Sequence, residues 1–334
     1  MALPKKLICL LFIILLSGCS KLNLNKEVTE PELKEYKDIP KVFFCPVNDC
    51  EGELFKVINS AKESVHCAFY DLDLERIINI LDKKSKNIEV KLVVDDANFD
   101  NVKHLKFAIK DSSSGLMHNK FCIIDNKIIL TGSFNPTENG AYKNDNNLVI
   151  IESFYLSKNY EDEFNELWNS EFRKGDNVIY PEFYLNNKKI ENYFCPEDNC
   201  AYYVAEEIKK AKNNIYFMTF SFTNNRIATA IILKHYQGLD IKGVFEARQV
   251  SKYSKFNLLE YQGIDVKRDN NKANMHHKVF IIDNKTVITG SFNPTEGADT
   301  RNDENIIIMH DKTMANLFMQ EFERVYNQEL SVAE

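Results

Sequence analysis

The sequence is poor in glycine and proline, and its clearest hydrophobic run is short. Eleven glycines and eight prolines among 334 residues exclude a collagen-like or low-complexity chain. The apolar run near the N-terminus, residues 7–16, is about half as long as the roughly 20 residues of a membrane-spanning helix. With 44% hydrophobic residues, the chain can bury the core of one large domain or of two smaller ones.

The chain also lacks a basic charge balance. Lysine and arginine number 42 and the acidic residues 49, which gives a net charge of −7. Removal of residues 1–18, which hold two lysines and no acidic residue, changes this charge to −9. Proteins that hold nucleic acid without sequence preference usually present a basic surface, because binding neutralises phosphates. The acidity counts against a nuclease but does not exclude one, because a basic cleft can exist locally.

Residues 1–18 are predicted to be a signal peptide. Two lysines precede the short apolar run, an order typical of export signals. The sequence "LSGC" that ends at Cys19 resembles the bacterial lipobox, which implies that Cys19 is lipidated as the first mature residue. An ordinary signal peptide followed by a chance cysteine is the alternative. We therefore predict an extracytoplasmic lipoprotein, in the outer membrane or at the cell surface, with residues 19–40 as a polar tether.

Cysteines recur in two equivalent segments, "FFCPVNDC" and "YFCPEDNC". In an exported protein, two cysteines so close together form a local disulfide more plausibly than half of a zinc site. An all-cysteine zinc site built by both segments and free thiols are the alternatives. The disulfide candidates are Cys45, Cys50, Cys195 and Cys200. Cys67 and Cys122 stand in apolar, strand-like runs and are predicted to be core residues.

The chain consists of two similar halves. "AKESVHCAFYDLDLERI" aligns with "AKNNIYFMTFSFTNNRI" further on, and the similarity continues through the last helical pattern of each half. The second half has about eight additional residues around "RQVSKYSKFNLLEYQ". A period of roughly 150 residues is too long for a solenoid, so we predict a duplicated domain. The expected boundaries are 41–172 and 193–328, with a connector at 173–192.

Strand and helix patterns alternate within each half. In the first half, "KVFF", "VHCAFY" and "IEVKLVVDD" are predicted strands, separated by amphipathic helical patterns. A further helix is expected next, then a hairpin that turns at Asp125, a last strand and a final helix. The alternation implies parallel pairing and the hairpin adds antiparallel pairs. The predicted fold class is therefore α/β of mixed type, with each half a mixed sheet flanked by helices.

One stretch recurs almost unchanged, as "MHNKFCIIDNKIILTGSFNP" and "MHHKVFIIDNKTVITGSFNP". Residues two apart on a strand share a face, so the histidine and lysine of each copy point together. An imidazole, an ammonium, a hydroxyl and a carboxamide on one surface suit a phosphate oxyanion, and the glycine allows close approach of the backbone. A preserved hairpin core explains the isoleucines but not this polar set. The residues are His118, Lys120, Asp125, Gly132, Ser133 and Asn135, then His276, Lys278, Asp283, Gly290, Ser291 and Asn293.

These spaced motifs resemble the paired motifs of the phospholipase D superfamily, and the resemblance covers both halves. It implies one bilobal unit with a single active site between the halves and with no metal or other cofactor. One histidine would attack phosphorus and form a phosphohistidine, while the other protonates the leaving alcohol and then activates water. Lys120 and Lys278 would be catalytic together with the histidines, because they supply positive charge to the phosphate. Phosphate would be bound by Ser133, Asn135, Ser291 and Asn293.

The family also places an acid after each motif to orient a catalytic imidazole. Glu304 fits this pattern, whereas Asn146 departs from it. In relatives this acid commonly reaches the histidine of the other half, so Glu304 is expected to orient His118. A carboxylate fixes the tautomer whose free nitrogen attacks, which makes His118 the predicted nucleophile and His276 the acid and then the base. The reverse assignment stays open, because the carboxylate also raises the pKa of His118. Asp125 and Asp283, at the turns, are expected to be structural.

The expected function is metal-independent hydrolysis of phospholipid head groups, which the lipid anchor and the acidity favour. An exported non-specific endonuclease of the same superfamily is the alternative, because the compact halves look closest to its small nuclease-like members. A catalytically inactive binding module is disfavoured by intact motifs in both halves. The expected partners are the phospholipid or nucleic acid substrate and, through the anchor, the membrane. We expect a monomer.

Overall fold

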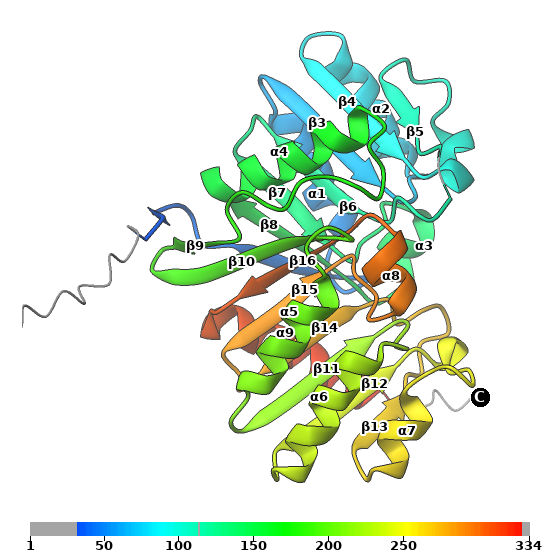
Figure 1. Ribbon diagram of the computed structural model, residues 1–334. Coiled ribbons are helices and arrows are strands. Elements are labelled where there is room, and N and C mark those ends of the chain that lie inside the picture. The colour runs from blue at the N-terminus through cyan, green and yellow to red at the C-terminus, as the bar shows by residue number, and fades with distance from the viewer. Residues whose placement is uncertain (1–31, 113, 329–334) are drawn as a thin grey trace, which may run out of the picture. The chain divides into compact units, whose positions relative to one another are not determined.

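The computed structural model describes residues 32–112 and 114–328, and from Leu33 onward these belong to one compact unit. The predicted signal peptide, Cys19 and most of the tether lie outside the described residues. Among the residues that are described, no helix is both long enough and apolar enough to span a membrane. Two mixed sheets, one from each half, organise this unit (Figure 1).

The sheet of the first half confirms the predicted mixture of parallel and antiparallel strands. Its order is β2-β8-β7-β6-β3-β4-β5. The pairs β3–β4 and β4–β5 are parallel, whereas the β6–β7 hairpin and its neighbours are antiparallel. The strands are β2 (Lys41–Cys45), β3 (Ser64–Phe69), β4 (Glu89–Val94), β5 (Ala108–Lys110), β6 (Lys120–Ile124), β7 (Ile128–Gly132) and β8 (Asn146–Glu152).

The second half repeats this strand order and extends it at one edge. Strands β10-β16-β15-β14-β11-β12-β13 correspond one by one to those of the first half, and β9 and β1 are added beside β10. β9 comes from the expected connector and β1 from the expected tether, so both segments contribute to a sheet instead of serving only as linkers. The strands are β1 (Lys34–Glu35), β9 (Glu182–Leu185), β10 (Lys188–Cys195), β11 (Asn214–Thr219), β12 (Asp240–Phe245), β13 (Asp265–Arg268), β14 (Lys278–Ile282), β15 (Thr286–Gly290) and β16 (Glu304–Met309).

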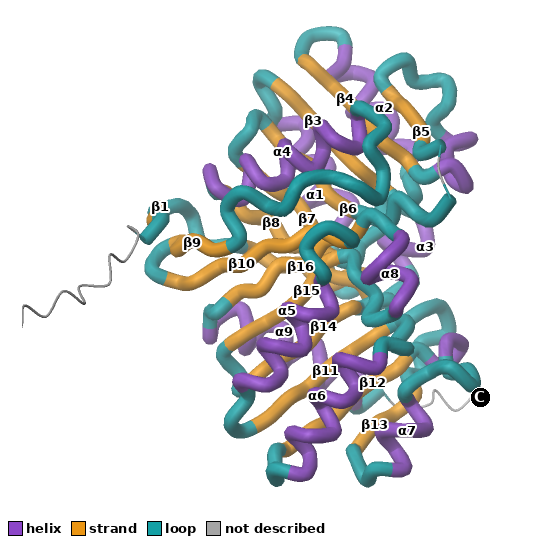
Figure 2. Tube along the Cα trace, in the orientation of Figure 1, coloured by secondary structure: helices purple, strands orange, loops and turns teal. Residues whose placement is uncertain are grey.

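Helices pack on both faces of each sheet (Figure 2). The two faces of a sheet belong to different hydrophobic cores. α1 and α2 cover one face of the first sheet, as α5 and α6 do in the second. α4 and α9 bury Phe164 and Phe318 in a core that contains residues of both halves. This shared core holds the two halves together. The helices are α1 (Cys50–Ser60), α2 (Glu75–Ser85), α3 (Glu138–Tyr142), α4 (Phe154–Trp168), α5 (Cys200–Lys210), α6 (Asn225–Tyr236), α7 (Phe256–Tyr261), α8 (Glu296–Arg301) and α9 (Lys312–Tyr326).

The prediction of a further helix after β4 is wrong for the first half. The chain there forms only a short 3-10 helix, η1 (Asp96–Asn101), followed by β5. Its sequence, "DANFDN", has no apolar stripe to bury, and none of its residues is buried. The corresponding segment of the second half forms a 3-10 helix, η2 (Ala247–Gln249), and then α7, whose Phe256 and Leu259 are buried.

Three disulfides are present in the described residues. Cys45 is joined to Cys50, and Cys195 to Cys200, at the start of α1 and of α5. The third joins Cys67 to Cys122, which corrects the expectation that these were only core residues. Both are indeed buried, but the antiparallel pairing of β3 with β6 places them directly opposite one another. Their Cα atoms are 4.1 Å apart across 55 positions of sequence.

Candidate active site

The backbone of each half holds the histidine motif of the other half. The amide of His118 donates to the carbonyl of Asp303 at 3.0 Å, and the amide of His276 donates to that of Asp145 at 2.9 Å. In each case the preceding methionine forms an isolated parallel bridge with the same aspartate. Both motifs therefore meet at the interface between the halves, where β6 and β14 begin two residues later.

The two histidines have different side-chain partners. Nδ1 of His118 lies 2.8 Å from Oε2 of Glu304, which comes from the second half. Nδ1 of His276 lies 2.8 Å from Oδ1 of Asn146 and 3.1 Å from the carbonyl of Ser133, both in the first half. The amide of Asn146 is oriented by donation from its Nδ2 to the carbonyl of Gly140. His276 Nδ1 thus faces two acceptors and carries a proton, which leaves its Nε2 available.

The two motif serines are committed to these partners. Ser133 Oγ donates to Oδ1 of Asn146 at 3.2 Å, and Ser291 Oγ donates to Oε2 of Glu304 at 2.6 Å. Each hydroxyl also accepts from a backbone amide at 3.0 Å, that of Asn147 in β8 or that of Asn305 in β16. Both serines are fully buried. The serines position Asn146 and Glu304, which in turn position the two histidines. Contact of the serines with phosphate remains a prediction.

The two motif asparagines have unsatisfied polar atoms. The Oδ1 atoms of Asn135 and Asn293 are buried and have no hydrogen-bond partner within the described part of the chain. Most buried polar atoms of folded proteins are paired, so an unpaired one is evidence of a missing partner. A carboxamide can turn either its oxygen or its NH₂ group towards a ligand. Asn135 and Asn293 therefore suit a bound molecule better than the serines do.

Glycine is required at the end of β7 and of β15. Gly132 and Gly290 have φ angles of 134° and 144°, which residues with a Cβ atom rarely adopt. A Cβ atom at either position would also collide with the backbone carbonyl of Asn147 or Asn305. This close approach places each motif serine beside the first residue of β8 or β16, which is Asn146 or Glu304.

Each motif lysine is buried between its own backbone and an aromatic ring. Nζ of Lys120 donates to the carbonyl of the histidine two residues earlier, and Lys278 does the same at 2.7 Å. The ammonium groups lie 5.1 Å from the ring centre of Tyr70 and 5.0 Å from that of Phe220. These rings also pack edge-on against the two histidines. Sequence reasoning did not single out the rings, although they occupy matching positions after β3 and β11.

Burial shifts the protonation of every charged group in the site. It lowers the pKa of His118 and of His276 well below the usual value, and the neighbouring lysines lower both further. Burial lowers the pKa of Lys120 to about 7 and that of Lys278 well below its ordinary value. It raises the pKa of Glu304 to about 8, against the opposing effect of Lys120. A bound phosphodiester would supply the negative charge that two lysines and two imidazoles need here.

The motif aspartates lie at the far end of the hairpins, away from the histidines. The carboxylate of Asp125 accepts from the backbone amides of residues 62–64, and Asp283 accepts from those of residues 212–214. Burial raises the pKa of Asp125, but its amide donors outweigh this and the net pKa is lowered. Both residues also have positive φ angles at the turn. They tie each hairpin to the start of the neighbouring strand.

A second polar layer joins the halves behind the site. His277 points to the opposite face of β14, where its Nε2 lies 2.9 Å from Glu321 of α9 and its Nδ1 3.1 Å from Nδ2 of Asn147. At the matching place, Asn305 donates to Oδ1 of Asn119 at 2.6 Å. Neither contact is visible in the sequence, because each depends on how one half packs on the other.

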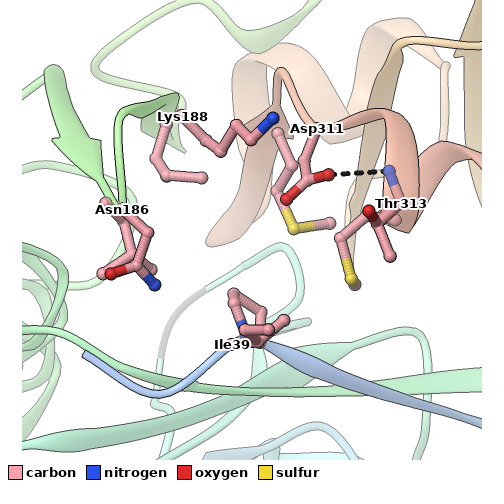
Figure 3. Close-up of a pocket in the computed structure, with 10 residues that line it drawn as sticks. Ile39, Asn186, Lys188, Asp311 and Thr313 are labelled. Carbon is pink, nitrogen blue, oxygen red and sulfur yellow. Dashed lines mark hydrogen bonds between the residues drawn. The ribbon is translucent and has the colours of Figure 1, made fainter. Parts of the chain in front are cut away.

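The pocket shown in Figure 3 is separate from this site. It has a volume of about 190 Å³ and is lined by Ile39, Lys188 and Met309 among other residues. Met309 ends β16, whose first residue is Glu304, so the pocket lies at the other end of that strand. Asp311 at its rim accepts from the backbone amide of Thr313 at 2.7 Å. No residue of the histidine motifs lines it.

Both halves of the chain are similar to known proteins. A family described as "Cardiolipin synthase, PLD-like domain" matches residues 54–168 and 204–326, which contain both motifs. A phospholipase D of Rickettsia conorii is 36% identical over 137 residues, which cover 41% of this chain and 68% of that protein. A mitochondrial cardiolipin hydrolase of Mus musculus is 34% identical over 119 residues, 35% of this chain and 54% of that protein.

Among solved structures, a phosphatidylserine synthase of Haemophilus influenzae shares the fold over both halves. It has a TM-score of 0.67 and 12% sequence identity, and the match covers 86% of each chain. The family match takes in most of both halves, each with its own histidine motif. The chain belongs to the phospholipase D superfamily and is a phosphodiesterase of the phospholipase D type.

Proposed function

We propose that the protein hydrolyses phospholipid head groups through a phosphohistidine formed on His118. The unequal partners of the two histidines are the observation that carries this proposal. His118 faces a carboxylate and His276 faces a neutral amide, although both belong to copies of one motif. A nucleophile and an acid need different environments: a carboxylate stabilises the cationic phosphohistidine that forms on the nucleophile, whereas the acid needs only an acceptor that fixes its ring.

In the first step, Nε2 of His118 attacks phosphorus. The bound phosphodiester favours the imidazolium form of His276, which carries a proton on Nε2 as well as on Nδ1. The new P–N bond forms while the bond to the leaving alcohol breaks, and His276 gives the proton from its Nε2 to the departing oxygen. The imidazole of His118 then bears phosphorus on one nitrogen and a proton on the other, so it is cationic. Glu304, 2.8 Å from Nδ1, stabilises this cation.

In the second step, His276 has lost its proton and acts as a base towards water. The hydroxide equivalent attacks phosphorus, the P–N bond breaks, and phosphatidic acid leaves. His276 keeps the proton of the water, which restores the starting state. General acid and base help of this kind contributes roughly 10²–10⁴ in rate.

The buried lysines and asparagines serve the phosphate oxygens. Lys120 and Lys278 are 2% and 3% exposed, so little water competes for their charge. The phosphate raises their lowered pKa values when it binds, because it places negative charge beside them. Asn135 and Asn293, with their unpaired amide oxygens, lie in the same motif segments and complete the set of hydrogen-bonding groups.

A phospholipid substrate is supported by the acidity of the chain and by the names of its relatives. The net charge is −7, which opposes non-specific binding of a polyanion. The relatives from Rickettsia conorii and Mus musculus carry lipid-directed names. Lipidation of Cys19 would keep the enzyme at a membrane, and acyl labelling of wild type against Cys19→Ala tests that part of the proposal.

The function is tested by hydrolysis assays in EDTA. The substrates are phosphatidylcholine, phosphatidylglycerol, single-stranded DNA and duplex DNA, with the double variant His118→Ala/His276→Ala as the blank. We expect release of a phospholipid head group, unchanged by EDTA and absent from the blank. Cleavage of DNA without cleavage of any phospholipid would replace the proposal with the endonuclease alternative. Activity that EDTA abolishes would contradict the metal-free mechanism.

A further inference from the structure

The two halves differ in charge beside the site. Residues 247–255 connect the buried Glu246 to α7 and contain three basic residues and no acidic one (yellow in Figure 1). This segment is part of the additional sequence of the second half. Asp95 corresponds to Glu246, and the residues that follow it in the first half, 96–101, contain two aspartates and no basic residue. Duplication alone does not explain this reversal of sign.

The basic segment contacts the residues that lead to His276. It follows β12, the parallel neighbour of β11, and β11 leads into Phe220 beside that histidine. The guanidinium of Arg248 donates to Oδ1 of Asn274 at 3.3 Å and to the backbone carbonyl of Lys272. Asn274 is two residues before His276, so the segment touches the chain that enters the motif.

Further cations extend this surface. Lys272 belongs to the contacted stretch, and Lys143 of the first half is brought close because Asn271 donates to its carbonyl at 3.1 Å. Glu246 is buried, where it accepts from the amide of Met275 and forms an ion pair with Arg248 at 3.4 Å. Glu260 of α7 is exposed. We define the basic surface by its five cations, which are Lys143, Arg248, Lys252, Lys255 and Lys272.

An exposed tyrosine stands on the same surface. Tyr253 is 67% exposed, and the ammonium of Lys252 lies 4.9 Å from the centre of its ring. Tyrosine has an apolar ring and a polar tip, which suits the boundary between lipid and water. Lysines and arginines next to such a ring are attracted to anionic head groups. Each of these side chains increases the affinity for the membrane roughly fivefold.

We infer that the basic surface docks on an anionic phospholipid bilayer, so that substrate enters the site from the side of the second half. This inference rests on the proposed function, because it takes a phospholipid as substrate. A bilayer can touch one half alone. A nucleic acid that crossed the site would also approach the first half, where Lys103 and Lys110 are paired with Asp100 and Asp96 and add no net positive charge.

The test compares binding of the full chain to phosphatidylcholine vesicles with and without phosphatidylglycerol. The variant carries Lys252→Gln, Lys255→Gln and Lys272→Gln; Arg248 is kept because it fixes the backbone. A control variant removes three exposed lysines from the first half, with Lys83→Gln, Lys106→Gln and Lys127→Gln. The measured quantity is the ratio of the affinity for vesicles with phosphatidylglycerol to the affinity for vesicles without it. A lipid anchor contributes equally to both affinities, so its contribution cancels in the ratio.

We expect wild type and the control to prefer the anionic vesicles, and the variant to lose this preference by about 100-fold. The preference of wild type should also weaken as salt is added. An unchanged ratio in the variant would overturn the inference. So would loss of binding to a single-stranded oligonucleotide while vesicle binding stayed the same.

A second measurement separates this inference from the proposed function. Hydrolysis of a soluble, short-chain phosphatidylcholine needs no bilayer, so the variant should hydrolyse it at the wild-type rate. If wild type hydrolyses no phospholipid at all, the proposed function fails. A reduced rate of the variant on the soluble substrate would place the lysines in substrate binding and contradict a docking role.

Discussion

The carboxylate of Glu304 lies 2.8 Å from Nδ1 of His118, although the two residues are 186 positions apart. Its counterpart is the 2.8 Å contact between Asn146 and His276. The duplicated halves thus exchange partners across their interface, and one partner can be charged while the other cannot. This difference gives two copies of one motif two separate roles.

Replacement of Glu304 by glutamine should lower kcat by about 10²-fold. Glutamine keeps an acceptor for Nδ1 but cannot stabilise the cationic phosphohistidine with a charge. Single-turnover kinetics with a chromogenic phosphodiester measure the effect on the first step. A rate within twofold of wild type would remove the orienting role of Glu304.

The matched variant is Asn146→Asp, which gives His276 a carboxylate as well. The new charge should raise the pKa of His276 and move the alkaline limit of activity to higher pH. The acidic limit, set by the nucleophile, should stay in place. A shift of the acidic limit alone would assign His276 as the nucleophile.

Loss of either histidine should remove nearly all activity. His118→Ala and His276→Ala each leave the site with one of its two catalytic groups, because the halves share a single site. We expect a loss of at least roughly 10³-fold in each variant. Survival of about half the activity in either one would show that each half works independently.

Replacement of Lys120 by methionine should stabilise the fold while it abolishes activity. The pKa of Lys120 falls from 10.5 to about 7 on burial, so the folded state disfavours its charge. This cost is fully present below pH 7 and fades as pH rises towards 10.5. Near pH 7 the free energy of unfolding should therefore increase by roughly 2–4 kcal/mol. Lys127→Met, on the exposed turn of the same hairpin, should change it by less than about 0.5 kcal/mol. Destabilisation by Lys120→Met at pH 7 would contradict this reasoning.

Removal of the Cys67–Cys122 disulfide should cost more stability than removal of Cys45–Cys50. The first closes a loop of 55 positions and the second a loop of 5. Loop-closure entropy predicts about 4 kcal/mol for the long loop and about 2 kcal/mol for the short one. Paired substitutions, Cys67→Ala/Cys122→Ala and Cys45→Ala/Cys50→Ala, allow the two losses to be compared in urea. A smaller loss for the longer loop would show that chain entropy does not dominate.

Periodicity and duplication made much of the fold predictable. Short apolar runs located β3, β4 and the β6–β7 hairpin, and the repeated motif located the polar cluster. The contact of Glu304 with His118 was expected only through the family resemblance. Local sequence contains no information about which residue of one half reaches the other.

The features that were missed depend on packing. The Cys67–Cys122 bond requires the register of β3 on β6, which two apolar runs cannot specify. The rings of Tyr70 and Phe220 follow buried strands and look like core aromatics until the lysines are placed beside them. β9 lies in the polar connector, where no apolar pattern predicts a strand. It forms because its backbone pairs with that of β10.

The assignment of His118 as nucleophile is tested most directly by trapping the phosphoenzyme. A slow substrate is mixed with the enzyme, the reaction is quenched at alkaline pH, and the modified peptide is identified by mass spectrometry. We predict phosphate on the peptide that contains His118, at close to one group per chain, and a reduced amount in Glu304→Gln. Phosphate on the peptide that contains His276 would reverse the two roles, and phosphate on both peptides would contradict a single shared site.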